Sequence, residues 1–213
     1  MIPIRDKGCY CFTLETIDTV DIFTKPMYKQ IIVHSLNHFI DNKGLVVYGW
    51  CLTSNKLYII CQEQHNLSLK ELRKEFVAFT CKKLVEALKE ENSYRKEWLL
   101  KHFEKPAAFT NEETLLSCWG EVKTIAEIDM QDPESMADYL ELIHSIPVKE
   151  RVVQYPADYL YSSARDYNAL PGLVKIIKLT SVEQQLTEIE NRKNGFRTIY
   201  KNNRPAGEGS ASL

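Results

Sequence analysis

Two histidines in this sequence stand at a spacing that can hold a metal ion. His34 and His38 lie four residues apart in a segment of helical periodicity, which places both on one helix face. The glutamate that accompanies such a pair in zinc hydrolases is missing. Cys9 and Cys11 form a Cys-x-Cys pair, but no second pair lies nearby in the sequence. We therefore expect no metal at either pair.

Basic side chains gather on two segments that could contact the backbone of a nucleic acid. One segment follows Ser68 and the other surrounds Trp98. Runs of this kind are also typical of an ordinary solvated helix face. The net charge of −2 counts against a nucleic-acid partner, because proteins that hold its backbone usually carry a basic excess. The residues concerned are Lys70, Arg73, Lys74, Lys82, Lys83, Arg95, Lys96, Lys101 and Lys105.

The composition is typical of a soluble globular protein. With 213 residues, 44% of them hydrophobic and 26% charged, the chain is long enough for one sizeable core and a tail. No apolar stretch approaches the roughly 20 residues that cross a bilayer. The six cysteines are scattered, mostly inside apolar runs, and nothing at the N-terminus reads as a signal segment. We expect a cytoplasmic protein with reduced, packed thiols and no membrane span.

The elements that would position these residues begin with a hairpin. Ser54 and Asn55 read as a turn between two apolar runs, and we expect this hairpin at the centre of a sheet. Because side chains alternate across a strand, Lys56 and Tyr58 project from the same face just after the turn. Strands are expected at residues 8–15, 45–53 and 57–61, with one or two more between 107 and 130.

Helical periodicity and end signals predict the remaining elements. Gly44 closes the first helix, and Ser68 opens the second with the Ser-x-x-Glu form of a capping box. Helices are expected at 27–42, from 68 onward, from 132 to just before Pro147, and from 181 to about 192, with a disordered tail after 201. Strands interleaved with helices predict an α+β fold, in which helices pack on an antiparallel sheet.

Three stretches of the chain match the motifs of a known family in order and spacing. They are Tyr-Gly-Trp-Cys-Leu-Thr-Ser-Asn at 48–55, Ile-His-Ser-Ile-Pro-Val at 143–148, and Pro-Ala-Asp-Tyr-Leu-Tyr-Ser-Ser-Ala-Arg-Asp-Tyr at 156–167. The chain thereby resembles the REP-associated tyrosine transposases, a branch of the single-tyrosine HUH transposases. The resemblance implies a ferredoxin-like domain at 1–177, with a helical extension at 178–200 and a tail at 201–213 outside it.

The resemblance also implies a reaction and the residues that would perform it. In that family two histidines on a central strand hold magnesium or manganese, which polarises a phosphodiester of single-stranded DNA, and a helix tyrosine attacks. The histidine positions correspond to Lys56 and Tyr58 in this chain, and the nucleophile position corresponds to Leu142. The family's asparagine and glycine near the nucleophile are replaced by Ile146 and Arg151.

These replacements predict that the chain keeps the family's fold but lacks the side chains that cleave DNA. The ammonium of Lys56 has no lone pair for a metal, although it can contact a phosphate as a point charge. The alkyl side chain of Leu142 cannot attack phosphorus. We therefore expect no metal cofactor and no catalytic residue.

Several aromatic residues could act as a replacement nucleophile, stack on DNA bases or pack in the structure. Tyr139 lies three residues before Leu142, but a displacement of one turn removes the in-line geometry, so we expect it to pack. Trp98 and Trp119 could stack on extruded bases, although core packing is the commoner fate of tryptophan. An architectural role is expected of Tyr159, Tyr161 and Tyr167.

Three functions remain open from the sequence. The first is a catalytically inactive DNA-binding protein that holds single-stranded or hairpin DNA, alone or as a homodimer. The second is a protein-interaction or regulatory scaffold, which the near-neutral charge favours. The third is a metal-dependent single-strand endonuclease with a relocated site, whose ligands would come from His34, His38, Glu63 and His65. For the first function, DNA contacts are expected from Lys56, Lys70, Arg73, Lys74, Lys82, Lys83, Arg95 and Lys96.

Overall fold

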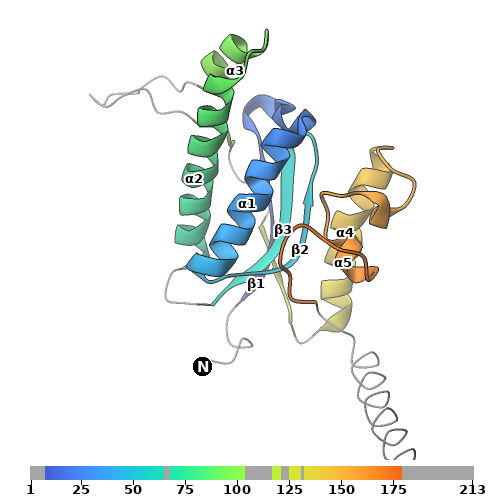
Figure 1. Cartoon of the computed structure of the whole chain (residues 1–213). Coiled ribbons are helices and arrows are strands. Elements are labelled where there is room, and N and C mark those ends of the chain that lie inside the picture. Colours follow the sequence, from blue (N-terminus) through green and yellow to red (C-terminus); the bar gives the residue numbers. More distant parts are fainter. Residues whose placement is uncertain (1–7, 65–67, 104–116, 121–124, 131, 179–213) are drawn as a thin grey trace, which may run out of the picture. The chain divides into compact units, whose positions relative to one another are not determined.

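Four antiparallel strands form the sheet of this protein. The computed structural model describes residues 8–64, 68–103, 117–120, 125–130 and 132–178 (Figure 1). The strands are β1 (Cys9–Glu15), β2 (Leu45–Leu52), β3 (Lys56–Glu63) and β4 (Ile125–Ile128), in the order β2-β3-β1-β4. All neighbours are antiparallel, which makes this a ferredoxin-like sheet and confirms the expected α+β class.

The register of β1 on β3 sets which side chains share a face. Glu15 lies opposite Lys56, and Thr13 lies opposite Tyr58, so these four residues project from the same side. The predicted hairpin is present, but only β3 is central. The prediction of a central position is wrong for β2, because β1 pairs with the other side of β3 and leaves β2 at the edge.

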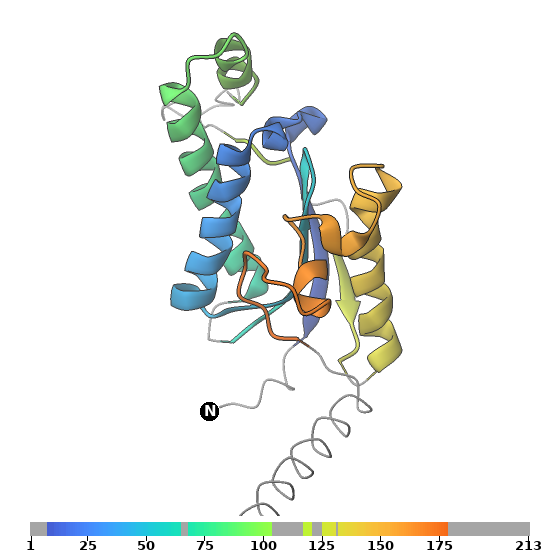
Figure 2. The same ribbon diagram turned by 45° about the vertical axis from the view of Figure 1, so that its right-hand side comes forward.

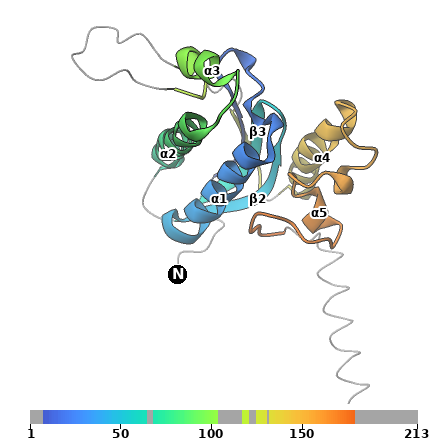
Figure 3. The same ribbon diagram turned by 45° about the horizontal axis from the view of Figure 1, so that its top comes forward.

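Helices cover both faces of the sheet. α1 (Pro26–Lys43) and α2 (Leu69–Glu90) pack against each other on one face, and α4 (Pro133–Lys149) lies on the other face against β2 and β3 (Figures 2 and 3). Because both faces are covered, every residue of β2 is buried. The short helical elements are η2 (Ile17–Thr19), η3 (Ile22–Thr24), α3 (Lys96–Phe103), η4 (Pro156–Asp158) and α5 (Ala164–Tyr167).

Two helix ends follow the signals expected from the sequence. The Ser68 hydroxyl accepts the Glu71 amide, and the Glu71 carboxylate accepts the Ser68 amide, which is the predicted capping box. After α1, Gly44 adopts a φ of 73°, a left-handed conformation that glycine takes at low cost.

The end of α4 differs from the expected one. The helix continues through Pro147 to Lys149, so the predicted end before the proline is wrong. The amide of Glu150 donates to the carbonyl of Ile146 at 2.8 Å, which closes the last turn around the position where the proline lacks an amide. Arg151 then adopts a φ of 59°, a left-handed conformation in which glycine would be less strained.

The main hydrophobic core lies between the sheet and the α1–α2 pair. Its largest side chains include Phe12, Phe23, Leu36, Phe39, Trp50, Leu57, Phe76 and Leu84. All six cysteines are buried and none is disulfide-bonded, which confirms the expected packed thiols. Among the described helices none is long and apolar enough to cross a membrane.

Some of the remaining predicted elements fall within the described residues. Of the further strands expected between 107 and 130, β4 is present and Trp119 forms an isolated bridge with Thr16. The rest of that interval, and the helix and tail expected after 181, lie outside the described residues.

The outer edge of β2 is closed by a loop segment that takes the place of a fifth strand. The amide of Leu52 donates to the carbonyl of Tyr161, and the amide of Ser163 donates to the carbonyl of Trp50, both at 2.9 Å. The Ser163 hydroxyl accepts the Trp50 amide, also at 2.9 Å. Ser163 and Trp50 are both 0% exposed, so water cannot replace these partners. The segment therefore satisfies the backbone groups of an edge strand that would otherwise be open to pairing.

Replacing Ser163 with alanine should destabilise the fold. The change removes the acceptor of the buried Trp50 amide, and leaving such a group unpaired costs about 1–3 kcal/mol. A matched control is Ser145→Ala, because that hydroxyl bonds the Leu142 carbonyl of its own helix and, among the described residues, no other group. Urea denaturation should give a lower free energy of unfolding for Ser163→Ala than for Ser145→Ala. Equal values would contradict the role assigned to Ser163.

Candidate functional site

Lys56 begins β3 on the sheet face that α4 covers. Its ammonium lies 3.3 Å from the carboxylate of Glu15, its neighbour across the β1–β3 register. Glu15 is only 7% exposed, and a buried carboxylate is costly unless a positive charge accompanies it. The first of the two positions at which the resemblance implies a metal ligand is therefore occupied by an ion pair. The ammonium offers no lone pair and repels a cation.

Tyr58 occupies the second of these positions. It is half-buried between Thr13 of β1 and Cys51 of β2. Burial, together with the nearby charge of Glu150, raises the pKa of its phenol to about 12. The phenol is therefore protonated at neutral pH, and it is not the phenolate that would bind a metal or attack a phosphodiester.

The face of α4 that meets the sheet approaches the backbone of β2 closely at Gly49. A Cβ at Gly49 would lie 2.6 Å from a methyl of Leu140 and 3.1 Å from a methyl of Ile143. Leu142 points away from this contact and is 50% exposed. Tyr139 is half-buried one turn earlier on the same helix. The position that corresponds to the nucleophile thus presents an alkyl group to solvent.

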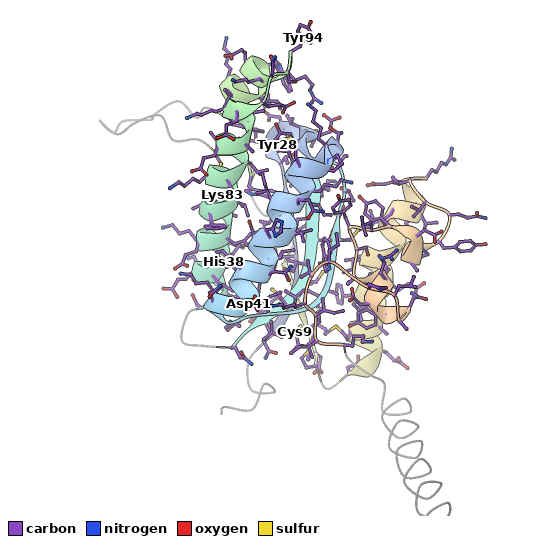
Figure 4. All side chains as sticks on the ribbon, viewed as in Figure 1. Cys9, Tyr28, His38, Asp41, Lys83 and Tyr94 are labelled. Carbon is purple, nitrogen blue, oxygen red and sulfur yellow. The ribbon has the colours of Figure 1, made fainter. Side chains whose placement is uncertain are left out.

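The alternative metal ligands lie on separate elements. His38 lies on α1 (Figure 4), and its ring centroid lies 5.1 Å from that of Phe79 on α2. His34 is exposed on α1. Glu63 ends β3, and His65 lies outside the described residues. Within the described ranges no group of three or more His, Cys, Asp or Glu side chains is placed to hold a metal ion. A relocated metal site therefore gains no support from this geometry.

The tyrosines of the third motif serve the architecture. The Tyr159 hydroxyl donates to the carbonyl of Leu52 at 2.7 Å and accepts the ammonium of Lys29 at 2.9 Å. The same ammonium lies 4.6 Å from the ring centroid of Tyr161. Tyr167 donates to the backbone of β2 at 2.9 Å. The predicted structural role of these three residues is confirmed.

His144 joins the second motif to the third, a role that the sequence reasoning missed. Its Nε2 lies 2.8 Å from the Ser163 hydroxyl, and its ring centroid lies 5.5 Å from that of Tyr167. Burial lowers the pKa of the imidazole to about 4, so the ring is neutral at pH 7. The only signal in the sequence was the presence of polar side chains inside otherwise apolar motifs, since buried polar groups need partners.

The cations predicted to contact DNA do not form one surface. Lys56 lies on the face covered by α4, whereas five of them lie on α2, which covers the opposite face (Figure 2). The α2 residues are Lys70, Arg73, Lys74, Lys82 and Lys83. Arg95 precedes α3 and pairs with Asp21 at 2.7 Å, and Lys96 donates to the carbonyl of Lys89. Their role in DNA binding stays a prediction.

The two candidate stacking tryptophans have different surroundings. Trp119 is buried, and its indole donates to the Thr80 hydroxyl at 2.8 Å, so core packing is confirmed for it. Trp98 is 51% exposed and stacks on His102 at 4.9 Å. Base stacking by Trp98 stays a prediction, and the neighbouring Lys105 lies outside the described residues.

Comparison with known proteins gives a structural likeness and no sequence match. Neither a protein-family model nor a curated protein sequence matches the chain. The structure is similar to the solved structure described as a REP-associated tyrosine transposase bound to a REP hairpin, with a TM-score of 0.51 and 13% sequence identity. The match covers 83% of this chain and 90% of the other. At this identity the likeness establishes the fold and a distant structural relationship to that transposase.

The half-buried His144 should make stability depend on pH. Its folded pKa of about 4 lies below the ordinary 6.5, so unfolding takes up a proton between these values. Stability from this group is fully present above pH 6.5 and is lost as the pH falls toward 4. Between pH 7.5 and 5 we expect a loss of about 2 kcal/mol.

The variant His144→Gln isolates this contribution. The wild-type chain and the variant are unfolded in urea at pH 7.5 and at pH 5, and the difference between their free energies of unfolding is compared. We expect the wild type to lose more stability than the variant on acidification. A pH-independent difference would show that His144 is not held neutral in the fold.

Proposed function

We propose that this chain binds single-stranded or hairpin DNA on a transposase-like scaffold without cleaving it. The observation that carries the proposal is the ion pair of Lys56 with Glu15, which puts an ammonium where strand cleavage would need a metal ligand. Tyr58 stays protonated beside it, and Leu142 supplies no nucleophile. Each part that the resemblance implies for strand cleavage is thus replaced by a group that cannot perform that step.

Two features support DNA as the partner. The fold is similar to that of a REP-associated tyrosine transposase whose structure was solved with a bound REP hairpin. In addition, α2 carries six basic and four acidic side chains, an excess of two positive charges within a chain of net charge −2. A local basic excess on an exposed helix attracts a phosphate backbone. The expectation of a homodimer rests on the resemblance alone, and light scattering of the purified chain tests it.

A protein-interaction scaffold is the second candidate. Three of the predicted DNA contacts, Lys56, Lys83 and Arg95, are engaged by carboxylates within the chain. Together with the acidic net charge, this pairing favours a partner other than a polyanion. The scaffold function predicts no affinity for DNA even at low salt.

Titration with fluorescent DNA separates these functions. Single-stranded and hairpin DNA are each titrated at about 50 and 200 mM salt, with and without manganese, and the samples are then run on a denaturing gel. We expect salt-dependent binding that does not require manganese, with no cleaved strand and no covalent adduct.

The other results each overturn part of the proposal. Absence of binding at the lower salt would favour the interaction scaffold. A cleaved strand or an adduct would show that the chain is an enzyme. In that case Tyr139→Phe would tell whether the displaced tyrosine forms the adduct, because the variant lacks only its hydroxyl.

A further inference from the structure

The eight cations predicted to contact DNA differ in what they already touch. Four are engaged within the chain: Lys56 by Glu15, Lys83 by Glu86, Arg95 by Asp21 and Lys96 by the carbonyl of Lys89. A fifth, Arg73, is half-buried beside a small apolar pocket between α1, α2 and the sheet. The remaining three are Lys70, Lys74 and Lys82. All three are exposed, and within the described part of the chain none has a carboxylate partner.

These three lysines lie along one row of α2. Lys70 and Lys74 are four residues apart, and Lys82 follows eight residues later, with Ala78 between them at the intervening position. Residues four apart are neighbours on a helix surface, and each step of four turns about 40° around the axis. The three lysines therefore follow one inclined ridge, which turns about 120° between Lys70 and Lys82. Twelve residues at a rise of 1.5 Å give the row a length of about 18 Å. We call Lys70, Lys74 and Lys82 the lysine row.

The carboxylates beside the lysine row are held by other partners. Glu71 bonds Ser68 in the capping box, and these hydrogen bonds lower the pKa of its carboxyl. Glu75 pairs with Lys43 of α1 at 3.0 Å. Glu86 pairs with Lys83 at 3.0 Å. Each of these three carboxylates already bonds another group, so none of them pairs with a lysine of the row.

We infer that the lysine row binds the phosphate backbone of DNA, on the sheet face opposite Lys56 and Tyr58. The inference rests on the proposed function, and it assigns the contact with the DNA backbone to one surface of the protein. Along the helix axis the row extends about 18 Å, which is comparable to about five base pairs of duplex at 3.4 Å each, the size of a short hairpin stem. Exposed lysines on a helix contact phosphates as point charges and need no fixed geometry. The proposed binding surface is therefore separate from Lys56 and Tyr58.

Two triple variants with the same change in charge test this assignment. The row variant carries Lys70→Gln, Lys74→Gln and Lys82→Gln. The matched control carries Lys43→Gln, Lys83→Gln and Lys175→Gln, three lysines that are each paired with a carboxylate. Glutamine has nearly the helix propensity of lysine, and thermal denaturation checks that both variants fold. Each is titrated with a fluorescent DNA hairpin at about 50 and 200 mM salt.

Three phosphate contacts predict a strong salt dependence for the wild type. Its affinity should fall about 40-fold between the two salt concentrations. We expect the row variant to lose most of this dependence and to bind at least about tenfold more weakly at the lower salt. The control should stay within about threefold of the wild type, since its lysines are already neutralised.

The outcomes separate this inference from the proposed function. If the wild type binds DNA and the row variant binds equally well, the lysine row is not the contact. The same holds if both variants lose affinity equally. In either case DNA binding by the chain still stands. Loss of binding in Lys56→Gln alone would place the DNA on the α4 face and also overturn this inference. A wild type that binds no DNA would overturn both. Binding to phosphatidylserine vesicles in its place would assign the row to a membrane surface.

Discussion

The hydrogen bonds between Ser163 and Trp50 are the contact on which the rest of this structure depends. They close the edge of β2, a strand whose residues are all buried and whose outer backbone groups water cannot reach. The Ser163 hydroxyl also meets His144, so the same contact fixes α4 on its face of the sheet. The spatial relation of positions 56, 58 and 142 follows from this attachment.

The residues that hold the fold and the residues that would perform chemistry are different sets. Tyr159, His144 and Ser163 match the motifs of the family that the chain resembles, and each has a buried partner. Lys56 and Leu142 depart from those motifs; Lys56 pairs with Glu15 and Leu142 is exposed. Lys56 supplies to the buried Glu15 carboxylate the positive charge that offsets the cost of its burial. In the function that we propose, the ion pair also leaves position 56 without a ligand for a metal ion.

The sequence predicted the elements better than their contacts. The capping box at Ser68 and the stop at Gly44 act within one turn, so local spacing was enough to place them. The edge position of β2 and the passage of α4 through Pro147 depend on which strand pairs with β3 and on bonds made beyond the proline. Local patterns do not contain that information. The His144–Ser163 contact joins residues 19 positions apart, and its partners are visible only in three dimensions.

The sequence predicted which residues of the candidate site share a face, but not what surrounds them. The alternation of β3 correctly put Lys56 and Tyr58 on one face, because that depends only on the period of a strand. The pairing of Lys56 with Glu15 could not be foreseen, since it requires the register of β1 on β3. The same limit applies to the basic residues of α2. Their sequence gives a charge run, and only the structure shows which lysines already have partners.

The most direct test is whether two side chains alone separate this protein from a metal site. Manganese is titrated by calorimetry into the wild type and into Lys56→His/Tyr58→His, with circular dichroism to confirm that both are folded. If the scaffold is intact and only its ligands are lost, the double variant should bind manganese and the wild type should not. Manganese binding by the wild type, or a folded double variant that binds none, would contradict the proposal that the chain keeps the scaffold and lacks only the metal ligands.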